Sequence, residues 1–356
     1  MRIEIKPFDT LFFRDGKPFT MGENNWADGL FPPPPSVIYG ALRATYFAHH
    51  PNELSKANQS EDPTKNLKIN DISYVSNSTN FYPVPANLAI EETNKKNYRA
   101  TKLKMKEVTS SAAVKVMCSE PGKKVESSSG VFFTDTSLAN YLTNNLDLEK
   151  LNNKSKNIFK MSELILTEPK IGIGRDYNTK TSESGKLYRL GMKRLKGFSI
   201  LVDFEGLELP ENGLLRFGAE GKTSSYQKSN IYSTDFNLSD EKLTRFILYF
   251  STPAVFKNGW FPDFFNDKLE CVINDVSCKI LSLSMEKPLL LGGWDMEKNQ
   301  PKAMQKFIAP GTVYVLETDR EISAKEVYDH FSAPQMCEES YAKQGYGLFK
   351  IGVYND

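Results

Sequence analysis

The sequence contains few side chains that could act as a general acid or base near neutral pH. Its 356 residues include three histidines, His49, His50 and His330, and histidine is the side chain most often used for that chemistry. His49 and His50 come just before Pro51, where a helix C-terminus favours a polar or cationic group, so a structural role is expected. The sequence also lacks the nucleophile-elbow, zinc-protease, phosphate-loop and paired-carboxylate motifs. We therefore predict that the protein has no catalytic residues, and a ribonuclease built from scattered residues stays open as the alternative.

Metal ligands, long apolar runs and excess charge are also scarce. The four cysteines form no C-x-x-C pair, and no histidine lies at metal-ligand spacing, so we expect reduced thiols, no metal site and no other cofactor. No apolar run approaches the roughly 18 residues of a membrane-spanning helix, and the N-terminus lacks the apolar core of a signal peptide. We therefore expect a cytoplasmic protein that does not bind a membrane. The formal net charge is only +1, so any contact with nucleic acid must come from local clusters of cations.

The most informative stretch runs from Phe31 to Arg43. Its four consecutive prolines predict a stiff extended arm, because proline fixes φ and has no amide donor. Ser36 follows at the expected N-cap, and apolar residues recur every four positions from Val37 to about Ala48, which predicts an amphipathic helix. The free N–H groups at its start favour an anion, and Arg43 can reach that end because helical side chains lean toward the N-terminus. A buried first helix with a solvated arginine is the alternative interpretation.

The segment from about Glu168 to Leu195 has the pattern of a long projecting β-hairpin. Two strand-like arms, 168–174 and 187–195, flank a polar tip from Tyr177 to Gly185. Most of the charged residues here are cations, namely Lys170, Arg175, Lys180, Lys186, Arg189, Lys193, Arg194 and Lys196. Cations on both arms can neutralise phosphates, and Gly174 permits a close approach of the backbone. The alternative is a solvated charged ribbon.

The glycine-rich segment Gly345–Gly352 combines small, aromatic and cationic residues in a similar way. Its glycines allow the main chain to lie against a phosphate or a packed helix, Lys350 supplies a charge, and Tyr346 can stack on a base. An edge hairpin that closes the C-terminal core explains the same residues equally well. Trp260 and Trp294 are likewise undecided between a core and a partner contact.

Strands joined by crossovers recur along the chain without the regular strand–helix alternation of a doubly wound sheet. At roughly 150 residues per domain, the length suggests two domains. The segment Val255–Gly259 repeats the residue-type order of Phe12–Gly16, which agrees with two copies of one fold. We therefore predict an α+β protein of two ferredoxin-like units, residues 1–240 and 241–356, with a large insertion at about 50–160.

Several segments closely resemble one protein family. They are Phe8–Phe19, Phe31–Arg43, Ile171–Asp176, Gly185–Tyr188, Gly292–Asp295 and Gly345–Gly352. These motifs resemble the third-subunit family of the type III-B CRISPR (Cmr) effector complexes, which are RAMP proteins. The resemblance covers both ends and the middle of the chain but leaves about 51–130 unmatched. It implies two ferredoxin-like (RRM-like) RAMP units, in agreement with the strand pattern.

The resemblance also implies a non-catalytic RNA-binding subunit of a CRISPR-Cas ribonucleoprotein that acts in antiviral defence. Such a subunit holds the single-stranded 5′ repeat-derived tag of crRNA. It bridges the large cyclase-bearing Cmr subunit to the neighbouring Cmr backbone subunit. The hairpin acts as a thumb beside the guide, so target RNA is an indirect partner. From the motifs and the resemblance together, the residues expected to contact RNA are Arg14, Ser36, Tyr39, Gly40, Arg43, Gly174, Arg175, Lys186, Arg189, Lys193, Arg194, Tyr346 and Lys350. The alternatives are a crRNA-processing endoribonuclease of the RAMP superfamily and an architectural bridge without RNA contacts.

Overall fold

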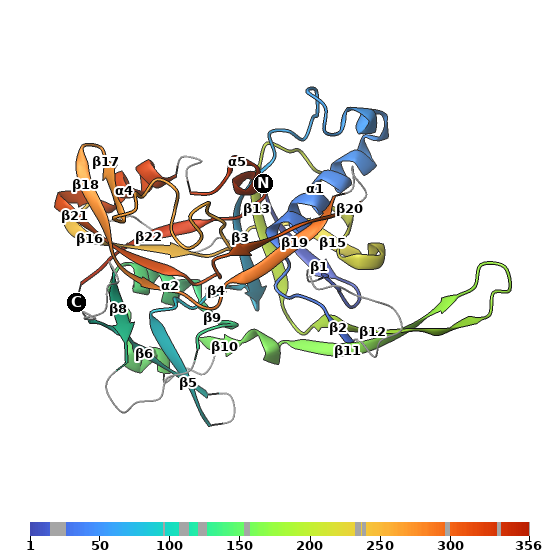
Figure 1. Cartoon of the computed structure of the whole chain (residues 1–356), viewed down its shortest axis with the longest axis horizontal. Helices are drawn as coiled ribbons and strands as arrows, with labels where there is room; N and C mark the ends of the chain where they lie inside the picture. Colours follow the sequence, from blue (N-terminus) through green and yellow to red (C-terminus); the bar gives the residue numbers. More distant parts are fainter. Residues whose placement is uncertain are drawn as a thin grey trace. The chain divides into compact units, whose positions relative to one another are not determined.

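The computed structural model describes the chain except residues 15–25, 95–96, 107–113, 120–126, 153–156, 232–235, 237–239, 296–299, 333–335 and 356. The fold is mixed α+β with mostly sheet, and the residues group into two compact units (Figure 1). Unit 1 comprises Met1–Leu67, Ser162–Ser229 and Leu290–Gln305, and unit 2 comprises Lys68–Met161, Asn230–Leu289 and Lys306–Asp356. The class agrees with the prediction, whereas the assignment to ferredoxin-like units stays a prediction. The units are interleaved in sequence and do not divide at the expected 240/241 boundary.

Unit 1 contains a sheet segment of four antiparallel strands. Their order is β13, β1, β15, β14, and they span Ser199–Glu205, Arg2–Pro7, Thr223–Lys228 and Asn212–Arg216. Ile3 of β1 lies opposite Val202 of β13, Ile5 lies opposite Ile200, and all four side chains are buried. These apolar pairs fix the register, because a shift by one residue would turn them to the other face of the sheet.

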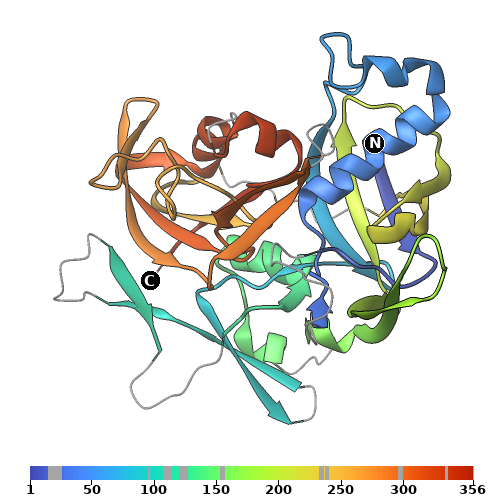
Figure 2. The same cartoon turned by 45° about the vertical axis from the view of Figure 1, so that its right-hand side comes forward.

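Helix α1, Pro35–His49, contacts β14 (Figure 2). Its buried face includes Ile38 and Leu42, as the four-residue spacing predicts. The N-cap is Pro34, without a side-chain cap hydrogen bond, so the prediction that Ser36 is the N-cap is wrong. Proline suits the first helical position because its φ is already helical and an N–H there would have no intrahelical partner. A 3₁₀ helix, η1 (Pro51–Lys56), follows directly.

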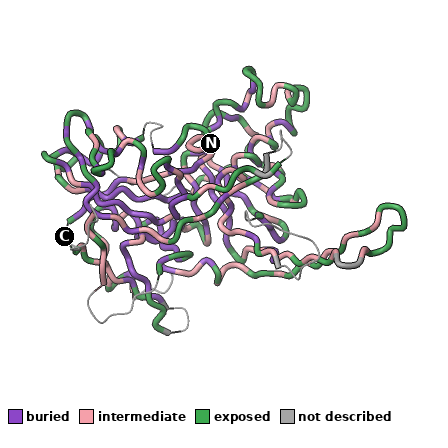
Figure 3. Tube along the Cα trace, viewed as in Figure 1, coloured by how far each residue is buried: buried purple, intermediate pink, exposed green. Residues whose placement is uncertain are grey.

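Strands β11 (Ile165–Arg175) and β12 (Ser182–Leu195) form an antiparallel hairpin that extends from the rest of unit 1 (Figure 1). A short parallel strand, β2 (Trp26–Asp28), pairs with β12 near the base of the hairpin. The far part is exposed or half-buried on both arms (Figure 3). Tyr188 packs so closely over Gly172 that a Cβ there would lie 2.0 Å from its ring, which explains the glycine.

The remaining short elements of this part of the chain are η2 (Met161–Glu163), η3 (Ala219–Gly221) and the two-stranded sheet of β19 (Leu289–Asp295) and β20 (Gln300–Phe307). Within η3, Glu220 has a φ of 62°, between Gly218 at 86° and Gly221 at 61°. Among the helices described, none is long and apolar enough to cross a membrane.

Unit 2 contains two larger sheet segments and a hairpin. The first has the order β10, β9, β4, β3, which span Ile158–Lys160, Val131–Thr134, Thr79–Pro83 and Lys68–Ser76. The second has the order β22, β16, β21, β18, β8, β7, with β17 also paired to β18. These strands span Phe349–Val353, Lys242–Phe250, Val313–Ser323, Val276–Ser284, Lys115–Cys118, Lys104–Lys106 and Glu270–Ile273. The hairpin consists of β5 (Leu88–Asn94) and β6 (Asn97–Lys102).

Four helices are described in unit 2. They are α2 (Asp135–Leu142), α3 (Leu148–Asn152), α4 (Ala324–Phe331) and α5 (Glu339–Lys343). A capping box of Ser323 and Glu326 starts α4, as the spacing of these two residues in the sequence predicts. The end of α2 packs on β22 at Gly352, where a Cβ would lie 2.6 Å from the carbonyl oxygen of Leu142.

The segment 68–161 is part of the core of unit 2, although the sequence suggests an insertion into a smaller core. Tyr82 of this segment is fully buried in one cluster with Ile247 and Tyr249 of β16. The Tyr249 hydroxyl donates a hydrogen bond to the carbonyl oxygen of Pro83 at 2.7 Å. Large aromatic side chains such as these bury enough apolar surface to hold the segment against the C-terminal strands.

Candidate nucleic-acid interface

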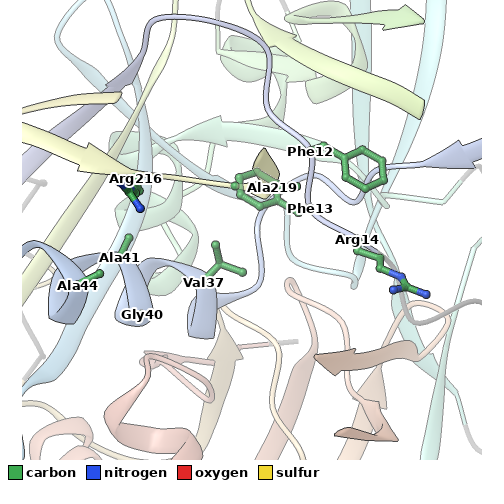
Figure 4. A pocket seen from close by; sticks show the side chains of 10 residues that line it. Phe12, Phe13, Arg14, Val37, Gly40, Ala41, Ala44, Arg216 and Ala219 are labelled. Carbon is green, nitrogen blue, oxygen red and sulfur yellow. The ribbon is translucent and has the colours of Figure 1, made fainter. Parts of the chain in front are cut away.

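A groove of about 300 Å³ lies in unit 1 beside helix α1. It is lined by Phe12, Phe13, Arg14, Val37, Gly40, Ala41, Ala44, Arg216, Gly218 and Ala219. Figure 4 shows Val37, Ala41 and Ala44 along one wall, with Arg216 and Arg14 toward opposite ends of the view. The lining contains two arginines and neither an acidic residue nor a histidine, so its charge favours an anionic ligand.

One wall of the groove is a flat face of α1. Val37, Gly40, Ala41 and Ala44 are spaced by three and four residues and therefore lie on one side of the helix. Gly40 is exposed, and a Cβ added there would meet no atom within 4 Å. Because these side chains are small, an extended polymer can approach the helix backbone closely.

The opposite wall is held in place by packing and by a main-chain hydrogen bond. Phe13 is buried and packs edge-on against Phe217, with ring centroids 5.1 Å apart. The Ala219 N–H donates to the carbonyl oxygen of Phe12 at 2.9 Å. Gly218 has a φ of 86°, a conformation that favours glycine. This wall is therefore preformed.

The cations of the groove, Arg14 and Arg216, are both exposed. Neither makes an ion pair with any residue in the described part of the chain. Arg14 is one of the predicted contacts, whereas sequence reasoning missed Arg216. Arg216 ends the edge strand β14, and no motif in the sequence distinguishes it from other arginines on strands.

Arg43 is held by its own unit and does not line the groove. Its Nε donates to Thr64 Oγ1 at 2.7 Å, and its terminal nitrogen contacts Asp62 at 2.6 Å and Asn58 at 3.0 Å. Burial by itself raises the pKa of Asp62, but hydrogen bonds from Thr64 and Asn58 and the charge of Arg43 bring that pKa below its usual value. In this structure Arg43 fastens the segment 51–67 to α1.

The other residues predicted at the start of the chain are close to the groove but outside its lining. Ser36 and Tyr39 are half-buried in the first turns of α1. Asp15 and Gly16, which follow Arg14, lie outside the described residues.

The hairpin cations divide into two groups. At the base, Lys193 donates to Thr167 and lies 3.7 Å from Asp28, and Arg194 pairs with Glu168 and Asp9. Farther out, Lys186 pairs with Glu183. Arg175 and Arg189 are exposed, without an ion pair to any described residue, and a Cβ at Gly174 would lie 2.7 Å from the Lys186 Cβ. Of these two arginines, Arg175 lies toward the tip, and Arg189 lies at the outermost level that pairs with β2.

Tyr346 and Lys350 belong to unit 2 and are engaged within it. Tyr346 is 3% exposed, and its ring lies 5.1 Å from that of Phe307. The Lys350 ammonium lies 3.3 Å from the Asp71 carboxylate and 4.1 Å from the ring centroid of Phe236. These contacts agree with the edge-hairpin interpretation, and a role of the two residues in RNA binding stays a prediction.

The undecided tryptophans and the histidines are not among the residues that line the groove. Trp260 is half-buried against a core cluster of unit 2, and the side chain of Trp294 lies outside the described part. His50 packs on Tyr46 with ring centroids 4.5 Å apart, and burial lowers the pKa of His330. The described residues contain no group of three or more His, Cys, Asp or Glu side chains that could hold a metal ion.

The fold is mixed α+β with mostly sheet, and unit 1 has a groove lined by two arginines and no acidic residue. The chain belongs to the CRISPR-associated protein (Cas_Cmr3) family, whose model matches residues 3–354. The resemblance found in the sequence, to the third subunit of type III-B Cmr complexes, is thereby confirmed.

Two solved structures are similar in fold. One is described as the type III-B Cmr-beta complex bound to cognate target RNA and AMPPnP, and the other as the same complex bound to cognate target RNA. Each match has a TM-score of 0.53 and 16% sequence identity and covers 97% of this chain and 95% of the other. At this identity the similarity concerns the fold. A comparison with curated proteins gave no match.

Proposed function

We propose that the chain is a non-catalytic RNA-binding subunit of a type III-B Cmr ribonucleoprotein, and that the groove of unit 1 holds the 5′ tag of crRNA. The observation that carries this proposal is the pair of arginines, Arg14 and Arg216, in a groove whose lining has no acidic residue. Single-stranded RNA presents a phosphate at every nucleotide, so arginines toward the two ends of a groove fit a strand that runs along it. Membership of the Cas_Cmr3 family makes RNA the expected polyanion.

The shape of the groove also fits a strand better than a small ligand. The face of Val37, Gly40, Ala41 and Ala44 carries no large side chain, so a sugar–phosphate backbone can lie against the helix. The opposite wall is preformed and would need little reordering on binding. In this proposal Arg14, Arg216 and the surface at Gly40 contact the RNA, and Arg43 supports α1 from behind.

The proposed protein partners are the large cyclase-bearing Cmr subunit and the neighbouring Cmr backbone subunit, with the hairpin beside the guide where it pairs with target RNA. The support is the similarity to chains of Cmr complexes described as bound to target RNA. A second support is that two arginines of the hairpin are exposed, Arg175 toward the tip and Arg189 at the outermost level that pairs with β2.

The runner-up, a crRNA-processing endoribonuclease, needs groups that transfer a proton in the cleavage step. The lining of the groove offers none, because it contains no histidine, carboxylate or lysine. Incubation of the subunit with repeat RNA, with and without divalent metal ions, is expected to leave the RNA intact. Discrete cleavage that disappears in His49→Ala/His50→Ala or in His330→Ala would favour the endoribonuclease instead.

The binding test compares Arg14→Ala and Arg216→Ala with Arg99→Ala, an exposed arginine on β6 of unit 2. Fluorescence anisotropy with a labelled tag RNA, measured across a salt series, is expected to show weaker binding for the two groove variants. The log–log salt dependence should flatten by roughly 0.7 per lost phosphate contact. Arg99→Ala should bind like the wild type. If both groove variants keep the wild-type affinity and slope, RNA does not occupy this groove.

A further inference from the structure

The base of the hairpin is connected to the groove through one short turn. Arg216, Gly218 and Ala219 line the groove, and the next residues, Glu220 to Lys222, face the hairpin side. The Lys170 ammonium on β11 lies 2.5–2.6 Å from both oxygens of the Glu220 carboxylate. The same turn therefore forms part of the proposed RNA site and holds the hairpin.

The contact between Lys170 and Glu220 lies where the hairpin leaves the body of unit 1. Strand β2 pairs with Arg189–Gly191 of β12, and Leu11 exchanges two main-chain hydrogen bonds with Lys193, at 2.8 and 2.7 Å. Lys170 lies opposite Leu190, one residue inside the outermost pairing with β2, which Arg189 makes. Beyond Arg189, only the two arms of the hairpin pair with each other in the described residues. The ion pair between Lys170 and Glu220 is therefore placed where it can fix the direction of the far part of the hairpin.

A second group of charges joins the same turn to the base of the hairpin. Asp9 lies 2.6 Å from the Lys222 ammonium and 3.1 Å from the Arg194 guanidinium, and Arg194 also pairs with Glu168 on β11. The hydrogen bond from Lys222, with those from the Thr10 main chain and from Arg194, lowers the pKa of Asp9 to about 2. Asp9 therefore stays ionised at every pH of interest and connects the turn to β12.

The backbone of the turn indicates that the Glu220 side chain is needed there. Its φ of 62° is in the left-handed region, where glycine is favoured and a residue with a Cβ costs roughly 1 kcal/mol. Glycines occupy two other positive-φ positions of the same turn, Gly218 and Gly221. Local strain at an exposed residue points to a role for its side chain, and here the carboxylate holds Lys170.

We propose that Asp9, Glu220 and Lys222 are positioning residues that fix the direction of the hairpin relative to the groove, so that one RNA molecule can contact both. The inference rests on the proposed function for its ligand, but the linkage itself is a property of the free protein. Because the pairs are exposed, each contributes little to folding, and their effect is on geometry. The affinity for an RNA that fills only the groove should not depend on these pairs. The affinity for an RNA that also reaches the hairpin should depend on them.

The test measures geometry and binding separately. Bioorthogonal spin labels at Thr179 in the tip and Ala48 at the exposed end of α1 report the distance between hairpin and groove by pulsed EPR. We expect a narrow distribution for the wild type and a broader one for Glu220→Gly and for Asp9→Asn. Glu220→Gly also relieves the left-handed φ, so it should fold at least as stably as the wild type. The charge-exchanged variant Lys170→Glu/Glu220→Lys should restore the narrow distribution. The control is Glu211→Gln, which removes a pair with Lys228 that does not involve the hairpin.

Two RNA probes then separate this inference from the proposed function. A single strand of about six nucleotides, short enough for the groove, should bind Glu220→Gly and the wild type equally. The same strand extended by an RNA duplex should bind Glu220→Gly about two- to fivefold more weakly, the range expected for an exposed ion pair. An unchanged EPR distribution in both variants would overturn the positioning role, whatever the RNA does. If both Arg14→Ala and Arg216→Ala bind the short strand as tightly as the wild type, the proposed function is overturned. The EPR result does not depend on that outcome.

Discussion

The stretch Phe31–Arg43, which includes the start of α1, and the segment Gly345–Gly352 share a sequence pattern but differ in their surroundings. Each combines glycine with an aromatic residue and a cation, and each suggests a backbone that RNA could approach. At Gly40 an added Cβ would meet nothing within 4 Å, whereas at Gly345 it would lie 2.9 Å from Ile69 Cγ2. Gly40 therefore leaves open space at the surface, whereas Gly345 allows the main chain to pack against a buried side chain. The pattern alone therefore identifies close approach, and the neighbouring atoms decide whether the approaching group is a ligand or the protein itself.

The largest expected effect is a loss of folding stability when the segment Gly345–Gly352 is mutated, which would distinguish this segment from the exposed face of α1. Tyr346→Ala should lower the free energy of unfolding by about 3–5 kcal/mol, because it leaves a cavity beside Phe307 and Tyr341. Urea denaturation measures this. Tyr328→Ala, which truncates a tyrosine that is 38% exposed, is the matched control and should cost much less. A Tyr346→Ala protein with wild-type stability and reduced affinity for tag RNA would instead place this segment in the RNA site.

The next effect tests the two kinds of arginine. Arg43→Ala should cost about 1–3 kcal/mol, because the buried Asp62 carboxylate loses a charged donor. Hydrogen exchange should become faster in residues 51–67. Arg216→Ala, at an exposed and unpaired arginine, should change stability by less than about 0.5 kcal/mol.

The pH dependence of Arg43→Ala follows from the same network. The pKa of Asp62 is below its usual value of 3.8 in the folded protein, so its contribution to stability is present above pH 3.8 and is lost as the pH falls through the folded value. We expect Arg43→Ala to lose stability less steeply than the wild type below about pH 4. An Arg43→Ala variant with unchanged stability and a flatter salt dependence of RNA binding would show that Arg43 contacts a phosphate.

A smaller effect sharpens the assignment of the α1 face. Gly40→Glu places a negative charge in the open space of the groove and should weaken binding of tag RNA about tenfold, or about 1.4 kcal/mol. The helix itself should gain stability, because glycine costs roughly 0.5–1 kcal/mol relative to alanine inside a helix. Gly40→Ala is the matched control, with the same gain in stability and a smaller change in affinity. Equal RNA affinity for both variants and the wild type would argue against RNA on this face.

The smallest effect on folding is expected at the hairpin tip. Replacing Tyr177–Lys186 by an Asn-Gly turn should change the free energy of unfolding by less than about 0.5 kcal/mol, because Tyr177 is 84% exposed and the tip bonds mainly to itself. If the hairpin acts as a thumb, the shortened form should alter how target RNA switches on the assembled complex. Hydrogen exchange on the free and assembled protein checks the tip directly. Target-triggered activity that is unaffected by the shortening would return the hairpin to a solvated ribbon.

Much of the local structure could be predicted from the sequence. The proline arm and four-residue spacing predict α1 to within a residue of its observed end at His49. The paired arms predict a hairpin close to the observed strands Ile165–Arg175 and Ser182–Leu195. The motifs at both ends and in the middle of the chain indicate the Cas_Cmr3 family, whose model covers residues 3–354. These features depend on neighbouring residues, so a linear pattern contains them.

The N-cap and the two compact units were less accessible from the sequence. Ser36 fits the usual preference for an N-cap, but the proline run lets the helix begin at Pro35. The sequence suggests an insertion at about 50–160, whereas Tyr82 and its neighbours join the core with strands that come more than 160 residues later. Burial against a distant strand leaves no periodic signal by which the partner could be found.

Only the tertiary structure decided which cations are free to bind a ligand. Arg43 and Arg216 are both arginines on regular elements, and nothing next to them in the sequence tells them apart. Arg43 is bound because Asn58, Asp62 and Thr64 fold back onto α1, at separations of 15 to 21 residues. Arg216 is free of described ion pairs because its strand lies at the edge of its sheet segment, beside a groove without acidic residues. An arginine carries its charge in any fold, but whether that charge is already neutralised depends on residues that only folding brings near it.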